Sequence, residues 1–513
     1  MERTYVDVLV EPDNIDDAQH VRAQALAKAG VDDDGLIRVR VVRRSIDARA
    51  KMPRFQLRIA LGGEDETASV FQPKALGGKR VVVVGAGPGG YFAALTLLEA
   101  GIKPVLLERG RDVRARLKDV KKIYSEGLVN PHSNYCFGEG GAGTYSDGKL
   151  YTRSKKRGDV DRILDLFVAH GASPDIRVDA HPHLGSNVLP KLVRAMRDSI
   201  EGAGGEIHFE SHVDDLVLDG ERLRGVRLAG GETVEGDAVV LATGHSARDI
   251  YDLLQRRGVL IEAKPFALGV RIEHPQALVD QMFYHHTPRH PALPAASYRL
   301  SCQTEERGVF SFCMCPGGFV VPASTAPGEL VLNGMSLASR KAPFANAGLV
   351  AEIRLDDVQG DDALALLRFQ AGVEQTMFRA GDGKTQRAPA QRASDFQQGR
   401  ISSSLGETSY IPGLYAAPVH ELLPDFVTLA LQQGLALLGQ KHKGFDSEEA
   451  TLLAVESRTS SPVRIPRDQQ TLMHPEVAGL FPCGEGAGYA GGIVSAAMDG
   501  VAVATAVVGY LKK

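Results

Sequence analysis

A stretch near residue 80 constrains this chain more than any other part of its sequence. Arg80-Val-Val-Val-Val84 has the composition of a buried strand, and Gly85-Ala-Gly87-Pro-Gly89-Gly90 follows it directly. Apolar spacing predicts a helix from about Tyr91 to Ala100 and a second strand, Pro104–Leu107, that ends at Glu108. A strand, a glycine-rich turn and a helix in this order form a unit that binds the pyrophosphate of a dinucleotide.

The residues of the turn each suit that task. Gly85 permits the tight turn, Gly87 lets the backbone approach a pyrophosphate, and Gly90 lets the helix pack close to the sheet. Pro88 has its φ preset for the first helical turn, where a missing N–H is no loss. The open N–H groups around Gly89 and the positive end of the helix then face the phosphates. The segment therefore predicts the start of a Rossmann-type domain.

Glu108 ends the second strand, where a carboxylate can accept hydrogen bonds from both ribose hydroxyls of an adenosine. The same negative charge repels a 2′-phosphate, so the motif favours FAD or NAD over NADP. We place Arg109, the next residue, in the same cofactor-binding set.

Two further segments favour FAD over NAD. The first runs from Gly205 to Glu210, continues with Val213 and a hairpin, and ends in Asp237-Ala-Val-Val-Leu-Ala-Thr-Gly244. It resembles the adenine-side strand and the Ala-Thr-Gly turn of glutathione-reductase-type flavoproteins. This resemblance implies that Val213, Thr243 and Gly244 contact the cofactor.

The second segment, Leu480 to Ile493, combines a short strand, a glycine-rich turn and the start of a long apolar helix. Glu485 ends the strand, where its carboxylate can accept a hydrogen bond from a ribityl hydroxyl. Gly491 and Gly492 open the helix, whose N-terminus can place N–H groups at the flavin N1/O2 edge and stabilise the reduced anion. We predict cofactor contacts for Gly484, Glu485, Gly491, Gly492 and Ile493.

These segments, together with Phe137–Leu150 and Glu456–Arg464, resemble one family over nearly the whole chain. It is the bacterial family of FAD-dependent proteins known as uncharacterised FAD-dependent dehydrogenases. Glu485 departs from wider flavoprotein usage, since many relatives of the fold carry Asp there. The resemblance implies FAD and a redox role, but it does not supply a substrate.

The order of predicted elements divides this α/β chain into three domains. Residues 1–72 are interpreted as a small α+β domain with the order strand, helix, strand, strand. Residues 80–261 form the first part of a Rossmann-type FAD-binding domain, and residues 464–513 form its C-terminal part. Residues 262–463 mix strand-like and helical runs with Pro-rich loops. We therefore expect an inserted α+β substrate domain, with the flavin between it and the FAD domain.

The glycine-rich loop 137–150 exposes N–H groups that suit pyrophosphate and flavin contact. We include Gly141 and Ser146 among the cofactor contacts. Lys149 near flavin N5 or the pyrophosphate would help to hold negative charge, and the alternative is a solvated loop lysine.

Arg458 and Arg464 flank hydroxyl side chains and suit a carboxylate or phosphate, or else form inter-domain salt bridges. If both converge with Lys149, they make a cationic pocket for an anionic substrate or for the reduced flavin. His183 precedes a helix predicted to start near Asn187 and can face a substrate, although no HExxH-type pattern accompanies it. Lys149, Arg458 and His183 are the catalytic candidates.

The five cysteines lack the spacing of a disulfide framework, which indicates a reducing, cytoplasmic setting. Disulfide reductases of this fold need two thiols a few residues apart. Cys136 has no such neighbour, so we interpret it as a packed residue. Cys313-Met-Cys315 suggests a thiolate pair or a metal site on one strand face, but no further Cys completes a metal site. We interpret both as packed residues and predict no metal.

A formal net charge of −4 over 513 residues gives no indication of nucleic acid or an acidic membrane surface. The stretch 38–58 is strongly basic, but only Phe55 is available to stack on bases. A domain-docking or phosphate-binding surface is therefore favoured over an RNA site. We expect no secretory signal, and no membrane span, because no stretch approaches about 18 uninterrupted apolar residues.

We predict a flavin-dependent oxidoreductase that transfers a hydride at flavin N5 to or from an unidentified small substrate, with an anion as the candidate class. We interpret only the turn at Gly85–Gly90 as a dinucleotide fingerprint and expect no separate nicotinamide domain, so NAD(P)H would bind transiently at the flavin or another donor would reduce it. No His or Cys is compellingly placed for covalent attachment, so we expect non-covalent FAD. The competing functional class is a sensor or a structural flavoprotein. A nucleic-acid-linked flavoenzyme is a third possible class. Substrate and oligomeric state stay open.

Overall fold

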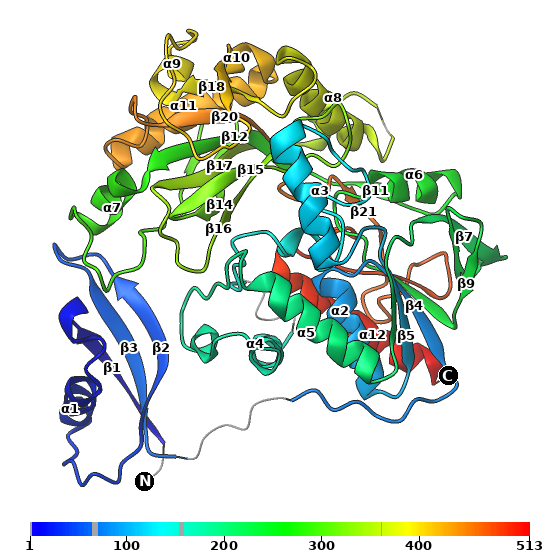
Figure 1. Ribbon diagram of the computed structural model, residues 1–513, viewed down its shortest axis with the longest axis horizontal. Helices are drawn as coiled ribbons and strands as arrows, with labels where there is room; N and C mark the ends of the chain where they lie inside the picture. Colours follow the sequence, from blue (N-terminus) through cyan, green and yellow to red (C-terminus); the bar gives the residue numbers. More distant parts are fainter. Residues whose placement is uncertain (1–2, 64–69, 153–157, 361, 513) are drawn as a thin grey trace.

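The computed structural model describes residues 3–63, 70–152, 158–360 and 362–512, so residues 64–69 of the predicted first domain lie outside the described ranges. Figure 1 shows an N-terminal unit, a parallel sheet flanked by helices, and a larger region of sheet and helices. These regions confirm the α/β fold class expected from the sequence.

The N-terminal unit has the predicted order of strand, helix, strand and strand. Its antiparallel sheet has the order β1-β3-β2 and consists of β1 (Thr4–Val10), β2 (Val39–Asp47) and β3 (Arg54–Leu61), with α1 (Ala18–Ala29) packed on it. Leu57 and Ile59 of β3 share a buried cluster with Leu26 of α1. Asp17 caps the helix by accepting hydrogen bonds from the N–H groups of Gln19 and His20, both at 3.0 Å.

The basic strand β2 docks on a neighbouring part of the chain. The Arg44 side chain donates to Asp179 at 2.7 Å, and its backbone N–H donates to the carbonyl of Val178 at 2.8 Å. The N–H of Ala180 returns a bond to the carbonyl of Arg44 at 2.8 Å. Arg44 is thus a docking residue between two regions of the molecule.

The second region is a parallel sheet in the order β22-β10-β4-β5-β6. Its strands are β4 (Arg80–Val84), β5 (Lys103–Leu107), β6 (Glu206–His208), β10 (Ala238–Leu241) and β22 (Leu480–Pro482). From β4 the chain adds β5 and β6 on one side and β10 and β22 on the other. The carboxyl end of β4 therefore lies at the point where strand order reverses, which is where open α/β sheets bind ligands.

Helices α2 (Pro88–Glu99) and α12 (Ile493–Leu511) pack against each other and carry the two predicted glycine-rich turns at their N-termini. Glycines allow this approach, because a Cβ on Gly500 would lie 2.2 Å from the carbonyl oxygen of Gly89. Within the described ranges, α12 alone is long and apolar enough to cross a membrane, with mean hydropathy 1.6. Half of that stretch is buried inside the protein.

The same region holds further helices and a small antiparallel sheet with the order β7-β8-β9. The strands are β7 (Val213–Asp219), β8 (Arg222–Leu228) and β9 (Thr233–Glu235). The helices are α3 (Val113–Glu126), α4 (Val160–Ala169), α5 (Leu189–Gly202) and α6 (Arg248–Arg256).

The third region is built on a seven-stranded sheet in the order β13-β14-β17-β12-β20-β18-β19, antiparallel except between β18 and β19. Its strands are β12 (Phe266–Pro275), β13 (Ser301–Gln303), β14 (Gly308–Cys315), β17 (Phe344–Ile353), β18 (Ala388–Arg392), β19 (Leu414–Ala416) and β20 (Thr451–Glu456). A hairpin joins β15 (Gly318–Pro322) to β16 (Leu332–Ser336). The helices are α7 (Gln276–Tyr284), α8 (Ala365–Ala380), α9 (Ala393–Gln397), α10 (Val419–Leu422) and α11 (Asp425–Lys441).

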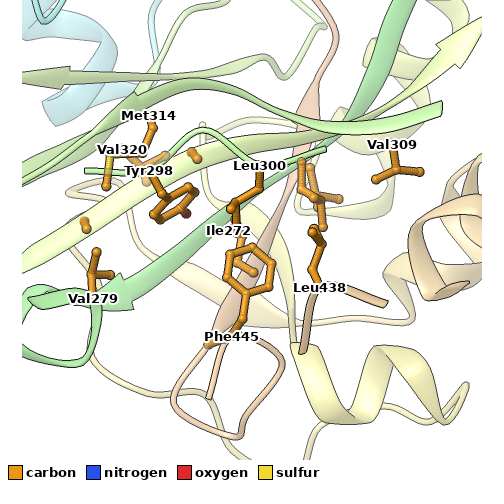
Figure 2. Packing of buried hydrophobic residues seen from close by; sticks show 14 of the residues in the cluster. Ile272, Val279, Tyr298, Leu300, Val309, Met314, Val320, Leu438 and Phe445 are labelled. Atoms are coloured by element: carbon orange, nitrogen blue, oxygen red, sulfur yellow. The ribbon is translucent and has the colours of Figure 1, made fainter. Parts of the chain in front are cut away.

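The core of this third region holds β14 in place. Figure 2 shows Ile272 of β12 and Val309 of β14 in one cluster with Leu438 of α11 and with Phe445. The Tyr298 ring meets Phe445 edge to face at a centroid distance of 5.7 Å. Burial of this kind fixes the position of the strand whose last residues reach the site described below.

Two short strands join the second and third regions. β11 (Glu262–Ala263) pairs antiparallel with β21 (Val463–Arg464), so the chain leaves and re-enters the parallel-sheet region at adjacent positions. An inserted domain has this geometry, and its boundaries at 262 and 463 stay a prediction.

Candidate functional site

A cavity of about 350 Å³ lies at the carboxyl end of β4 and has walls from both large sheets. Its volume falls in the range of small-molecule and cofactor sites, roughly 300–1,000 Å³. Its walls include sixteen of the predicted cofactor residues: Gly85, Gly87, Pro88, Gly89, Glu108, Arg109, Gly141, Ser146, Val213, Thr243, Gly244, Gly484, Glu485, Gly491, Gly492 and Ile493. The exception is Gly90, which lies behind the turn.

The first glycine turn has the geometry that its sequence predicts. Gly85 has φ +105°, and a Cβ there would lie 2.4 Å from the carbonyl oxygen of Ala242. A Cβ on Gly90 would lie 1.9 Å from the carbonyl oxygen of Gly85, so only glycine allows the helix this close. Gly87 precedes α2 and provides no side-chain cap. The first N–H groups of α2 thus suit a phosphate in the cavity.

Several walls of the cavity are bare backbone. No atom of the described residues would lie within 4 Å of a Cβ on Gly244, Gly484, Gly491 or Gly492. Gly492 caps α12 without a side-chain hydrogen bond, so a second helix N-terminus points into the same space. Bare walls and two uncapped helix starts fit a large flat cofactor that carries phosphates, as FAD does.

Glu108 binds three backbone N–H groups across the turn. Its Oε2 accepts from Ala86, and its Oε1 accepts from Gly110 and Gly138, each at 2.9 Å. The carboxylate thereby ties the first turn to the loop 137–150. It still lines the cavity, and a carboxylate oxygen can accept two bonds. Contact between Glu108 and a ribose stays a prediction.

Glu485 and His245 form a second polar pair in the cavity wall. The Glu485 carboxylate accepts a hydrogen bond from the N–H of Gly492, at the start of α12. His245 Nδ1 lies 3.3 Å from Glu485 Oε2. Burial disfavours the charged carboxylate, but these two partners outweigh it and hold the pKa of Glu485 below its usual value. His245 thus packs at the site, and Glu485 positions the helix start.

Two of the three catalytic candidates line the cavity, and the third lies beside one of them, because Lys149 and His183 pair in an isolated antiparallel bridge. Lys149 and Arg458 line the cavity, whereas His183 does not. The Nε2 of His183 lies 3.1 Å from the carbonyl oxygen of Ala338, which ties the ring to a neighbouring loop. Arg464 also lies outside the cavity wall, and its guanidinium carbon is 5.4 Å from the centre of the Tyr489 ring. Of the three cations, Lys149 and Arg458 meet at the cavity wall, and Arg464 does not join them there.

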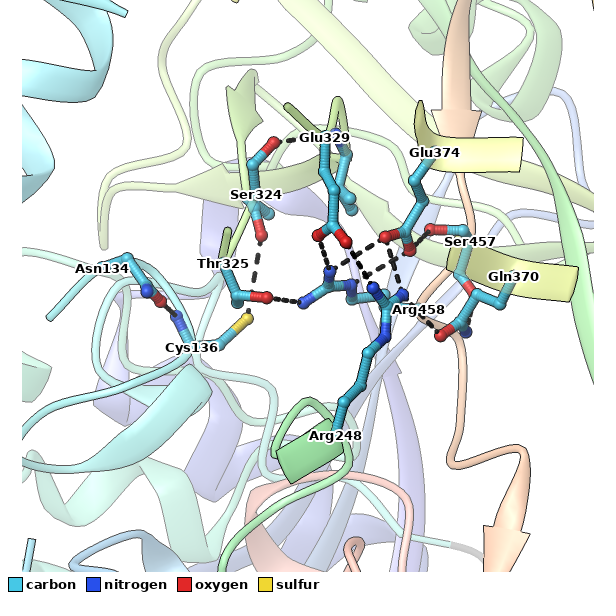
Figure 3. Close-up of polar contacts among 12 residues, drawn as sticks. Asn134, Cys136, Arg248, Ser324, Thr325, Glu329, Gln370, Glu374, Ser457 and Arg458 are labelled. Carbon is cyan, nitrogen blue, oxygen red and sulfur yellow. Dashed lines mark hydrogen bonds and ion pairs between the residues drawn. The ribbon is translucent and has the colours of Figure 1, made fainter. Parts of the chain in front are cut away.

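Arg458 is neutralised by carboxylates. Figure 3 shows its guanidinium among Glu329, Glu374 and Thr325, with the guanidinium of Arg248 beside it and in contact with the same two acids. Arg458 Nη2 lies 3.0 Å from Glu329 and 2.9 Å from Glu374. Arg248 lies 2.6 Å and 2.7 Å from the same two acids. The alternative interpretation of Arg458, a salt bridge between parts of the chain, describes this network.

Sequence reasoning missed the wall opposite the glycine turns. Phe312 and Cys313 at the end of β14 and Asn333 on β16 line it, next to Lys149 and Asp147. Lys149 is half-buried, and its Nζ lies 3.6 Å from Asp147 and 3.8 Å from Cys313 Sγ. The Cys-x-Cys pattern was visible, but 164 positions separate Lys149 from Cys313, and no local pattern reports such a contact. Among the described residues, no three metal-ligating side chains cluster.

Comparisons with known proteins indicate FAD-dependent families. Residues 265–459 match the family described as "FAD-dependent protein, C-terminal domain-like", residues 187–307 match "FAD dependent oxidoreductase", and residues 1–61 match a domain of unknown function. An uncharacterized protein of Clostridium beijerinckii is 40% identical over 513 residues, which is 95% of this chain and 96% of that protein.

Other relatives share less of their length or sequence. A digeranylgeranylglycerophospholipid reductase of Methanothrix thermoacetophila is 34% identical over 183 residues, 32% of this chain and 45% of that protein. Among solved structures, glycine oxidase from Geobacillus kaustophilus matches 84% of this chain and 95% of its own at 13% identity and a TM-score of 0.35. That score is too low to support an inference.

Proposed function

Since the chain belongs to a family of FAD-dependent proteins, we propose that it is an oxidoreductase that transfers a hydride at flavin N5 to or from a small substrate. The observation that carries the proposal is that two helices, each with a glycine at its N-cap, begin at the wall of one cavity. FAD, when bound, supplies the two-electron chemistry, and the protein orients it and excludes water.

Different parts of the wall suit different parts of FAD. The N-terminus of α2 would hold the pyrophosphate, and Glu108 would hold the adenosine ribose. Glu485 would accept a ribityl hydroxyl. The first N–H groups of α12, which follow Gly492, would face the flavin ring and favour its reduced anion.

A substrate would enter on the side of the third region. There Phe312 offers an apolar surface, Asn333 offers an amide, and Lys149 offers a positive charge. An anionic substrate is the class that the Lys149 ammonium favours. We assign the turn at Gly85–Gly90 to the adenosine end of FAD and no other segment to a separate nicotinamide domain, so a nicotinamide would bind only transiently.

Anaerobic reduction of the bound flavin tests this function. The flavin absorbance band would be followed with NADH, NADPH and a panel of small carboxylates and thiols. We expect at least one compound to bleach the band on the timescale of enzyme turnover. A flavin that stays oxidised with every compound, yet contributes to thermal stability, would assign the cofactor a structural or sensing role instead.

A further inference from the structure

The end of β14 is distorted where it reaches the cavity. Its pairing with β17 shifts register between Phe312 and Cys315, as in a β-bulge. Cys313, within this bulge, has φ +43°, a left-handed conformation that is rare outside glycine. Such conformations gather at functional sites, where the surroundings enforce them. The distortion brings Cys313 to the cavity wall.

Two cations face the sulfur atoms of Cys313 and Cys315. Lys149 Nζ lies 3.8 Å from Cys313 Sγ and 4.0 Å from Cys315 Sγ. From the opposite side, Arg271 donates to the carbonyl of Cys313 at 3.0 Å and lies 4.0 Å from Cys315 Sγ. Arg271 is fully buried and also pairs with Glu456 at 2.7 Å. This setting stabilises negative charge on sulfur.

The two thiols differ in access and in charge. Cys315 is buried, whereas Cys313 borders the cavity. A hydrogen bond between the two side chains lowers the pKa of Cys313 most; burial opposes this, and Lys149 and Arg271 lower it further. The same hydrogen bond and burial raise the pKa of Cys315. Asp147, beside Lys149, acts against the thiolate but is itself paired with Arg340.

We propose that Cys313 and Cys315 form a redox-active dithiol that exchanges an electron pair with FAD, with Lys149 as the counter-cation of the Cys313 thiolate. The proposal rests on the proposed function for its cofactor. The Cys315 S–H bond breaks and an S–S bond forms between the two sulfurs. The electron pair and the released proton convert oxidised FAD to FADH⁻, so atoms, electrons and charge balance. The reverse step opens the disulfide at the expense of reduced FAD.

An anaerobic dithionite titration of the oxidised holoprotein tests the exchange. We expect the wild-type protein to take up two electron pairs per FAD, one for the flavin and one for the disulfide. Cys313→Ser and Cys315→Ser would each take up one pair. Cys302→Ser is the matched control, because Cys302 lies on β13 outside the cavity wall, with its Sγ 3.8 Å from the carbonyl oxygen of Gly434.

Mass spectrometry of the wild-type protein provides a readout that needs no variant. After oxidation, alkylation under denaturing conditions should leave the peptide with Cys313 and Cys315 unlabelled and two hydrogens lighter, while Cys302 is labelled. A wild-type protein that takes up one electron pair per FAD and keeps both thiols free would overturn the dithiol. That result would leave the proposed function intact. The proposed function fails only if the protein binds no FAD or if no donor reduces the bound FAD.

Discussion

Two clusters at the cavity each contain a cation that the sequence marks as catalytic, and they differ in what surrounds the charge. Arg458 lies among two buried acids and a second arginine, so its charge is balanced within the protein. Lys149 is half-buried and faces two sulfur atoms and one acid that Arg340 already partners. The type of residue at a site is thus weak evidence of its task, and the groups paired with it decide.

The largest expected effect comes from Arg458→Met. The change keeps the stem but leaves buried Glu374 with less compensating charge, which costs about 3–5 kcal/mol of stability. Urea unfolding should show this loss. Arg224→Met is the control, because its pair with Asp219 at 2.9 Å is exposed and contributes at most about 1 kcal/mol. An Arg458→Met protein with wild-type stability and lost turnover would contradict this account. It would give Arg458 the direct role that we assign to Lys149.

A middle-sized effect concerns Asp147. Burial would raise its pKa, but Lys149 and Arg340 outweigh burial and lower the pKa to about 2 from an ordinary 3.8. The folded protein therefore binds fewer protons than the unfolded chain in this range, and stability falls as pH drops from about 4 to 2. The loss is about 2 kcal/mol. Asp147→Asn should flatten this part of the stability profile, and an unchanged slope would show that Lys149 and Asp147 do not interact.

The smallest expected effect on stability comes from Lys149→Met, because its ammonium is half-buried and its partners keep other contacts. Unfolding free energy should change by about 1 kcal/mol or less. Alkylation of Cys313 at neutral pH should instead slow about tenfold, since the thiolate loses its nearest cation.

Lys264→Met provides the control for that variant. Lys264 is also partly buried and donates to the carbonyl of Ser461 at 3.4 Å, but it does not line the cavity. Equal alkylation rates in all three proteins would remove the distinction between the two clusters.

Much of the fold was predictable because its determinants are local. The Val-rich strand and the turn at Gly85 and Gly90 indicate a close approach of helix and strand that only glycine allows. The glycine-rich turns on the cofactor side of the cavity were predictable for the same reason, because their backbone geometry follows from local sequence. The opposite wall was not, because Lys149 and Cys313 meet only through the packing of β14 in a separate core. The sequence could not decide between the two interpretations of Arg458, because its acids, Glu329 and Glu374, lie far from it in the sequence.

The central claim is that the cavity between the two sheets holds FAD without a covalent bond. Acid precipitation of the purified protein, followed by quantification of the supernatant, tests it most directly. We expect about one FAD per chain to be released. A colourless protein that takes up no FAD on reconstitution would contradict the claim.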